Sequence, residues 1–201
     1  MQRHKPRVLY VASNNRHKID EIKSLAGPDW DVRTAQDASP GLSWEESGAT
    51  FLENAKIKAY AVRQYTKSCI LADDSGLVVD ALGGAPGVWS SCYAADEGND
   101  DANNTKLLRE LNGVPREKRN AYFICTLLFI DEAGGEYVFT GKCHGTILES
   151  PRGRHGFGYD PLFEIAGHNG RSLAELTDEE KNQVSHRFNA MRQWQQFIEQ
   201  S

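Results

Sequence analysis

The first part of the chain alternates between short apolar runs and polar segments. Residues 8–12 form an apolar run that predicts a buried strand, and residues 18–25 have the spacing of a helix. Gly27-Pro28 is a helix-stop signal, so we expect this helix to end there. Residues 69–72 predict a second short strand, which we expect to end where Asp73-Asp74-Ser75-Gly76 begins.

A helix between these two strands has a well-marked start. Thr50 is followed three residues later by Glu53, which is the form of a capping box. Apolar residues then recur at helical spacing, namely Phe51, Ala55, Ala59 and Val62. We therefore expect a helix that begins directly after Thr50 and buries one face.

The second half of the chain predicts a hairpin followed by a loop and a helix. Residues 121–130 are apolar on both faces, as in a central strand, and the turn 131–135 leads to an alternating, half-exposed strand at 137–147. After a glycine-rich basic loop at 150–158, a C-terminal helix carries on one face Val184, Phe188, Met191 and Ile198. Interleaved strands and helices with one hairpin predict an α/β fold with a mixed sheet, in a single domain over residues 1–201.

Composition narrows the class of protein. A chain of 201 residues with 39% hydrophobic residues can bury a core, and a net charge of −5 argues against nucleic-acid binding. No apolar run approaches membrane-spanning length, and the run after the basic N-terminus is too short for a signal peptide. The four cysteines are widely spaced and form no C-x-x-C pair, which favours reduced thiols. We expect a cytoplasmic protein that needs neither membrane nor nucleic acid.

The segment Ser13-Asn14-Asn15-Arg16-His17-Lys18 lies between a predicted strand and a predicted helix. Unpaired N–H groups and the dipole at a helix N-terminus favour anions, and a lysine there can meet phosphate as a point charge. The segment lacks the glycines of a Walker loop, and an asparagine-rich turn with a solvated lysine is the alternative explanation.

Acidic residues occur at two places where a metal could bind. Asp73 and Asp74 follow a buried strand, and consecutive residues of a strand point to opposite faces, so the two carboxylates should have different roles. Glu45 and Glu46 precede the capped helix, on which Lys58 lies. Mg²⁺ prefers one or two carboxylates plus substrate phosphates, which suits this small acidic set. An Asx turn and dipole partners of the helix are the alternative explanations.

The last segment that could contact a ligand is divided. The glycine-rich sequence at 156–161 places Phe157 beside glycines, a shape that allows a nucleotide base to stack close to the backbone. Lys181, His186 and Arg187 supply three donors further along. On one continuous helix they would point in different directions, so we expect a break near Ser185 if they act together.

Taken in order, these motifs resemble the inosine triphosphate pyrophosphatase family, which hydrolyses non-standard purine triphosphates to monophosphate and pyrophosphate. The resemblance covers nearly the whole chain and is carried by residues 13–22, 45–59, 73–87, 156–163 and 176–187. It implies an elongated mixed α/β fold with two lobes around a central cleft, a homodimer, and Mg²⁺ as cofactor. The expected substrates are ITP, dITP, XTP and dXTP.

The resemblance also implies roles for individual residues. Asp74 would be the catalytic base and, with Glu45, a metal ligand, and Glu46 is a further candidate ligand. Triphosphate would be bound by Ser13, Asn14, Asn15, Arg16, His17, Lys18 and Lys58. The remaining substrate contacts, chiefly to the base, would come from Ser75, Phe157, Gly158, Tyr159, Asp160, Lys181, His186 and Arg187.

One position departs from the family pattern. Cys92 stands where bacterial members usually carry arginine, and Arg152 or Arg154 are the candidate substitutes for that arginine.

Two alternative functions are a Maf-like pyrophosphatase for modified pyrimidine nucleotides and a non-catalytic nucleotide sensor. Retention of Asp74 and Glu45 argues against the sensor. A haloacid-dehalogenase-like phosphatase needs two aspartates two residues apart, whereas Asp73 and Asp74 are adjacent.

Overall fold

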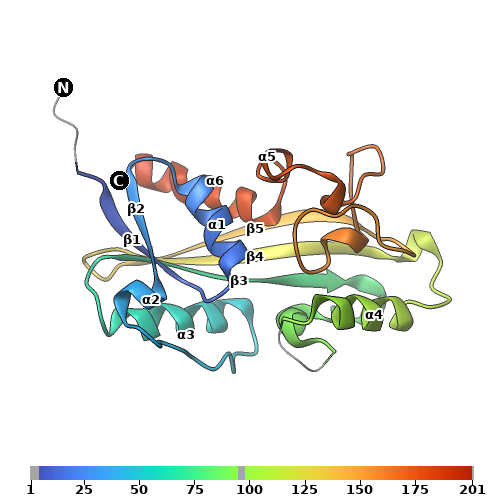
Figure 1. Cartoon of the computed structure of the whole chain (residues 1–201), viewed down its shortest axis with the longest axis horizontal. Helices are drawn as coiled ribbons and strands as arrows, with labels where there is room; N and C mark the ends of the chain where they lie inside the picture. The colour runs from blue at the N-terminus through green and yellow to red at the C-terminus, as the bar shows by residue number, and fades with distance from the viewer. Residues whose placement is uncertain (1–4, 95–97, 201) are drawn as a thin grey trace. The chain divides into compact units, whose positions relative to one another are not determined.

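The computed structural model describes residues 5–94 and 98–200, and its strands form one mixed sheet of six strands in the order β2-β1-β3-β4-β5-β6 (Figure 1). β1 pairs in parallel with both β2 and β3, whereas β5 and β6 are antiparallel. The predicted α/β fold with a mixed sheet and flanking helices is therefore confirmed. None of the helices in the described part of the chain combines the length and the apolarity needed to cross a bilayer.

The strands are β1 (Arg7–Ala12), β2 (Trp30–Thr34), β3 (Cys69–Val79), β4 (Asn120–Ile130), β5 (Glu136–Ile147) and β6 (Phe163–Ile165). The α-helices are α1 (Arg16–Ala26), α2 (Ala35–Ala38), α3 (Phe51–Arg63), α4 (Asp100–Glu110), α5 (Asp178–Lys181) and α6 (His186–Glu199). Short 3₁₀ turns lie between them, among them η2 (Gly87–Cys92) and η4 (Asp160–Leu162).

The chain divides into two compact units, and both are discontinuous in sequence. Unit 1 comprises Met1–Asp74, Cys125–Gly141 and Ala190–Ser201. Unit 2 comprises Ser75–Ile124 and Lys142–Asn189. The boundary in β3 falls between Asp74 and Ser75, so the two consecutive residues belong to different units.

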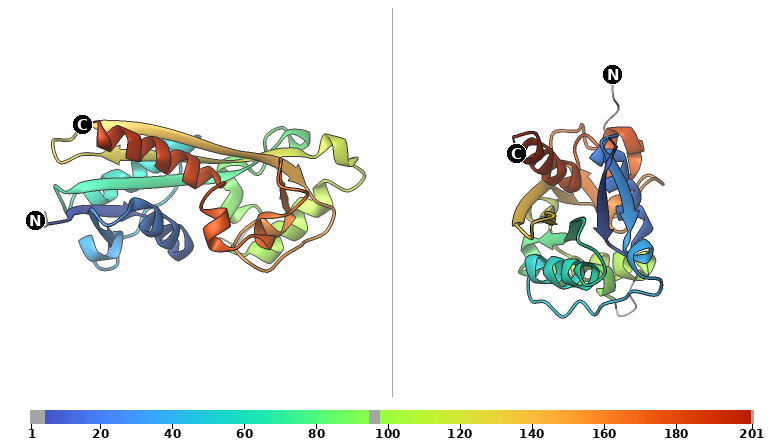
Figure 2. Two further views of the ribbon diagram at one scale, coloured as in Figure 1. Left: turned by 90° about the horizontal axis from the view of Figure 1, so that it is seen from above. Right: turned by 90° about the vertical axis from the view of Figure 1, so that its left-hand side faces the viewer.

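In unit 1, alternate residues of the strands build two separate cores. Leu9 and Val11 of β1 belong to a cluster with α1 and α6, whereas Tyr10 and Ala12 belong to a cluster with α2 and α3. This division follows from the period of two in a strand, since neighbouring side chains point to opposite faces of the sheet. Two pairs of helices therefore cover the two faces of this part of the sheet (Figures 1 and 2).

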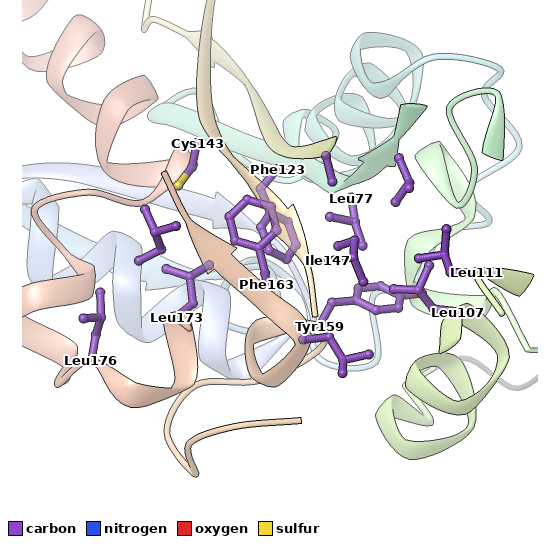
Figure 3. Close-up of a cluster of buried hydrophobic side chains, with 14 residues drawn as sticks. Leu77, Leu107, Leu111, Phe123, Cys143, Ile147, Tyr159, Phe163, Leu173 and Leu176 are labelled. Atoms are coloured by element: carbon purple, nitrogen blue, oxygen red, sulfur yellow. The ribbon is translucent and has the colours of Figure 1, made fainter. Parts of the chain in front are cut away.

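Unit 2 has its own hydrophobic core, which includes side chains from β3, β4, β5, β6 and α4 (Figure 3). Phe123 and Phe163 pack with their ring centroids 4.8 Å apart. Tyr159 is only 4% exposed and lies beside Leu107 of α4 and Leu111, the C-cap of that helix (Figure 3). The segment around Tyr159 is thus fixed to the core of unit 2.

The predicted start of α3 and the predicted end of α1 are confirmed. Thr50 and Glu53 form both hydrogen bonds of the predicted capping box at the start of α3. α1 ends at Ala26 with Gly27 as its C-cap, as predicted, but it begins at Arg16, two residues before the expected position. The reason is Asn15, whose side chain accepts a hydrogen bond from the backbone of Lys18 and so serves as the N-cap.

The predicted end of β3 is wrong. The strand does not stop at Ala72 but continues through the Asp-Asp-Ser-Gly segment to Val79. Leu77 and Val79 are fully buried in the core of unit 2, and their burial continues the strand beyond the polar residues. Asp73 and Asp74 therefore lie in the middle of a strand.

The C-terminal helix is also different from the prediction. α5 ends at Lys181 and α6 begins at His186, so the expected break near Ser185 is present. Val184 lies in this break, outside α6, and the core face of α6 includes the unpredicted Trp194. The elements β2, α2, α4 and β6 had no predicted counterpart.

Two side-chain amides of α6 cap backbone carbonyl groups of β5. Asn189 donates to the carbonyl oxygen of Lys142 at 2.9 Å, and Gln193 donates to that of Thr140 at 2.8 Å. β6 pairs with Gly145–Ile147, the last residues of β5. The amides of α6 therefore bond to carbonyl groups outside the segment of β5 that β6 covers.

Core packing around α6 gives a stability prediction. Trp194 is fully buried, and its ring lies 5.3 Å from that of Trp30 and 5.8 Å from that of Phe129, centroid to centroid. Trp194→Ala should lower the free energy of unfolding by about 3–5 kcal/mol, because a large buried side chain is lost and a cavity remains. Trp89→Ala is the control, since Trp89 is 57% exposed. Urea denaturation of both variants would contradict the prediction if the two losses were similar.

Candidate functional site

Consecutive aspartates of β3 lie on opposite faces of the sheet. Asp73 forms an ion pair of 2.8 Å with Lys18 of α1, and Asp74 forms one of 2.6 Å with Lys58 of α3. Asp73 is fully buried and Asp74 is 4% exposed, so each carboxylate needs a cation or several donors nearby. The predicted division of the two carboxylates between opposite faces is confirmed, and it gives each one a different lysine.

Asp74 lies within a compact polar group in unit 1. Asn54 donates to its second carboxylate oxygen at 3.3 Å, while the amine of Lys58 also forms an ion pair of 3.2 Å with Glu46. Asn54 and Lys58 are four residues apart on α3, so both reach the same side of the helix. Two carboxylates therefore converge on one buried amine. We call Glu46, Asn54, Lys58 and Asp74 the Asp74 cluster.

Asn54 was not among the residues predicted to act in the site. Its side-chain oxygen accepts a hydrogen bond of 2.8 Å from the backbone of Gly48, while its nitrogen bonds to Asp74. A Cβ atom at Gly48 would lie 2.6 Å from that oxygen, so only glycine allows this close approach. The sequence signal that could have found Asn54 is its four-residue spacing from Lys58 together with the Gly48 that precedes the helix.

The two carboxyl groups of the Asp74 cluster have opposite pKa shifts. Burial raises the pKa of Asp74 to about 6, although the charges of Lys58 and Lys18 act against the rise. Partial burial also acts to raise the pKa of Glu46, but the charge and hydrogen bond of Lys58 outweigh it and hold the pKa below its ordinary value. At neutral pH both groups are therefore anionic, and Asp74 is the one that accepts a proton more readily.

The segment Ser13–Lys18 lies at the junction of β1 and α1, as predicted. The Ser13 hydroxyl accepts from the backbone of Asn15, and Asn14 accepts from the amide of Gln36 at 3.1 Å. The first turn of α1 contains no acidic residue. Arg16 and His17 are exposed at the start of the helix. This segment offers a helix N-terminus with basic side chains, which suits an anion.

Lys18 is held at this junction through Asp73. The buried Asp73 carboxylate receives the amine of Lys18 on one oxygen and the thiol of Cys125 on the other, at 2.8 Å and 2.9 Å. Cys125 comes from β4 and is itself fully buried. Asp73 therefore supports the fold and orients a lysine of the candidate site.

In unit 2, Gly156–Asp160 forms a second candidate region, which we call the aromatic loop. Asp160 accepts hydrogen bonds from the backbone of Phe157 at 2.9 Å and from the amine of Lys181 at 2.7 Å. That amine lies 4.5 Å from the centre of the Phe157 ring, within reach of a cation–π contact. Gly156 has φ +76° and a Cβ there would lie 2.1 Å from Asp160, so glycine is required. The structure thus brings Phe157, Asp160 and Lys181 together.

The start of α6 places two further predicted residues in unit 2. Arg187 is fully buried and donates to the hydroxyl of Ser75 at 3.0 Å. The ring of His186 stacks on Phe123, with centroids 4.9 Å apart and an angle of 14° between the planes. The break before α6 allows both residues to be buried at the first turn of a new helix.

Other predicted residues lie apart from these groups. Glu45 and Glu46 are both exposed, and Glu46 forms the ion pair with Lys58. Arg152 bonds to Glu164 and to the carbonyl of Gly170. The side chain of Arg154 is exposed. Within residues 5–94 and 98–200, no three side chains of His, Cys, Asp or Glu are grouped so that they alone could hold a metal.

The sequence matches a family model described as the Ham1 family over residues 9–197. It is 48% identical to a dITP/XTP pyrophosphatase of Geobacter sulfurreducens over 184 residues, which cover 91% of this chain and 92% of that protein. It is 46% identical to a dITP/XTP pyrophosphatase of Opitutus terrae, covering 95% and 97% of the two chains.

Solved structures show the same fold. A Ham1 protein of Staphylococcus aureus superimposes with a TM-score of 0.85 at 38% identity, covering 96% of this chain and 98% of that one. A HAM1 protein of Coxiella burnetii gives a TM-score of 0.86 at 36% identity, with 96% and 99% coverage. These similarities extend over both units of the chain.

The raised pKa of Asp74 predicts a pH dependence of stability. The folded-state pKa of about 6 exceeds the ordinary value of 3.8, so the folded chain binds this proton more tightly than the unfolded chain. The stability that Asp74 contributes is therefore full below pH 3.8 and is lost as pH rises through about 6. Relative to Asp74→Asn, the wild type should lose about 3 kcal/mol of unfolding free energy across this window.

Urea denaturation of both proteins between pH 4 and pH 7.5, without divalent metal, measures this difference. In a Lys58→Met background, the loss attributable to Asp74 should shift to higher pH, because the largest opposing charge on the carboxylate is gone. A difference between wild type and Asp74→Asn that is constant over this range would contradict the raised pKa.

Proposed function

Since the chain belongs to the Ham1 family, we propose that it hydrolyses ITP, dITP, XTP and dXTP to the nucleoside monophosphate and pyrophosphate. The observation that carries this proposal is the Asp74 carboxylate, which is buried, has a pKa of about 6 and lies against Lys58 and Asn54. The matched relatives act on purine nucleotides, so a Maf-like pyrimidine pyrophosphatase is not favoured. A sensor that only binds would not need such a base.

The Asp74 cluster suits a magnesium ion. Glu46 and Asp74 point their carboxylates at the same amine of Lys58, so a second cation could be held by the same pair of groups. Mg²⁺ takes one or two protein carboxylates and completes its shell with water and substrate phosphates, which agrees with the small number of acidic groups here. We assign the metal to Asp74 and Glu46, because Glu46 reaches the amine that Asp74 binds, with Glu45 as the less favoured ligand. When bound, Mg²⁺ supplies charge neutralisation of the polyphosphate.

The chain's own residues would supply the remaining steps. Asp74 is the base that takes a proton from the attacking water, since a carboxylate with a pKa near 6 is ionised and still basic at neutral pH. Ser13–Lys18 and Lys58 bind the triphosphate through the start of α1 and two amines. Attack in line at the α-phosphorus then releases pyrophosphate.

The purine base is assigned to unit 2. The base would stack on Phe157 and its glycine neighbours in the aromatic loop, which also contains Tyr159. Asp160 holds both the backbone of Phe157 and the amine of Lys181. Arg187, which is buried against Ser75, and His186 are donors suited to the 6-oxo group of hypoxanthine and xanthine. Adenine would present an amino group to these donors and leave them unpaired, which disfavours ATP.

We further propose that both units serve one enzyme domain and that the protein is a cytoplasmic homodimer. The family resemblance supports the dimer, and the widely spaced free cysteines agree with a reducing compartment.

The reaction type can be tested from its products. Incubation of the protein with ITP and Mg²⁺ should give IMP and pyrophosphate in one step, because the proposed attack is at the α-phosphorus. Asp74→Asn should reduce kcat by about 10²–10⁴, the usual contribution of a general base. Anion-exchange chromatography separates the products, and formation of IDP with free phosphate would refute the proposed position of the water.

Two adjacent glutamates provide a matched test of the metal ligand. Glu46→Gln should raise the Mg²⁺ concentration that gives half-maximal activity by about tenfold or more, because a carboxylate of the Asp74 cluster is lost. Glu45→Gln removes the same charge from an exposed neighbour and should have little effect. Binding of Mn²⁺, followed by electron paramagnetic resonance, measures the affinity without catalysis. The opposite order of effects would assign the ligand to Glu45.

A further inference from the structure

The peptide groups of Gly158, in the aromatic loop, are held on both sides by helix α4. The carboxylate of Asp100 accepts a hydrogen bond of 2.6 Å from the Gly158 N–H, and the amide of Asn104 donates to the Gly158 carbonyl at 2.9 Å. Asp100 and Asn104 are four residues apart on α4, so they share one face of the helix. One helix face therefore binds both the donor and the acceptor of a single residue.

The contact with Asp100 fixes the peptide group that follows Phe157. The N–H of Gly158 belongs to the peptide group that follows Phe157, and Asp100 holds it. The N–H of Phe157 belongs to the peptide group that precedes it, and Asp160 holds that one at 2.9 Å. With both neighbouring peptide planes fixed, φ and ψ of Phe157 are restrained, and so is the direction of the Cα–Cβ bond from which its ring extends.

Helix α4 is itself firmly anchored in unit 2, so it can hold the aromatic loop in place. Asn103 is 2% exposed, accepts from the backbone of Ala94 and donates to the carbonyl of Ser91, at 2.7 Å and 3.1 Å. Leu107 is fully buried in the core of unit 2, in the same cluster as Tyr159 (Figure 3). The helix is therefore anchored by a buried amide and by the core, while Asp100 and Asn104 bind the aromatic loop.

We propose that Asp100 and Asn104 are positioning residues that orient Phe157 for stacking on the purine base. This inference rests on the proposed function, in which Phe157 contacts the base. Neither residue needs to touch the nucleotide, since Asp100 acts through the peptide group between Phe157 and Gly158 and Asn104 through the peptide group that follows Gly158. Their loss should weaken binding of ligands that carry a base and leave binding of polyphosphate unchanged.

The chain offers a close control in Asp101. Both Asp100 and Asp101 lie in the first turn of α4, so replacing either one removes the same favourable charge from the helix N-terminus. Asp101, however, is exposed, whereas Asp100 bonds to Gly158. Any effect specific to Asp100→Ala therefore reports on the loop and not on helix stability.

The experiment compares Asp100→Ala, Asn104→Ala and Asp101→Ala with wild type. For the first two, KM for ITP should rise by about tenfold while kcat changes little, and affinity for IMP should fall in parallel. Affinity for inorganic tripolyphosphate, measured by calorimetry, should stay within twofold of wild type. Amide hydrogen exchange at Gly158 should speed up in Asp100→Ala, and Asp100→Asn, which keeps an acceptor, should partly restore KM.

Two outcomes would overturn the inference. Equal KM values for Asp100→Ala and Asp101→Ala would remove the role of Asp100 in orienting Phe157. Equal losses of affinity for IMP and tripolyphosphate would indicate a general structural effect. If wild type hydrolyses ITP and only these variant tests fail, positioning is refuted alone, whereas a wild type that releases no pyrophosphate from ITP refutes the proposed function as well.

Discussion

The alternation of side chains along β3 is the constraint on which the candidate site depends. Because neighbouring residues of a strand point to opposite faces, Asp73 and Asp74 enter two different hydrophobic layers of unit 1. A buried carboxylate is stable there only with a nearby cation and further donors. Lys18 from α1 satisfies Asp73 on one face, and Lys58 from α3 satisfies Asp74 on the other. The two ion pairs that stabilise the buried carboxylates of β3 thus also position two lysines where we propose that phosphate binds.

Sequence patterns predicted the elements whose signals are local. The capping box at Thr50 and the apolar run of β4 concern residues within a few positions of one another, and both were confirmed. The end of β3 was predicted wrongly, because Asp73, Asp74 and Ser75 interrupt the apolar pattern that marks a strand. What keeps these residues in the sheet is the set of partners around them, and those partners come from α1, α3 and α6.

The sequence predicted which residues belong to the candidate site better than how these residues are oriented in space. Family resemblance supplied Asp74, Lys58 and Phe157, but it did not supply the residues that orient them. Asp100 and Asn104 act on a backbone group in a distant segment, and no periodicity records such a contact. The sequence likewise does not distinguish Glu45 from Glu46 as the metal ligand, since only the fold shows which side chain reaches Lys58.

The two amides that α6 presents to β5 have a consequence for the solubility of the sheet. Free carbonyl groups along a strand can template another chain, and such exposed edges are a common route to aggregation. By bonding to the carbonyls of Thr140 and Lys142, Gln193 and Asn189 occupy acceptors that an incoming strand would need. The final helix therefore has a protective role in addition to filling the core, because its outward amides make β5 a poor template for uncontrolled association.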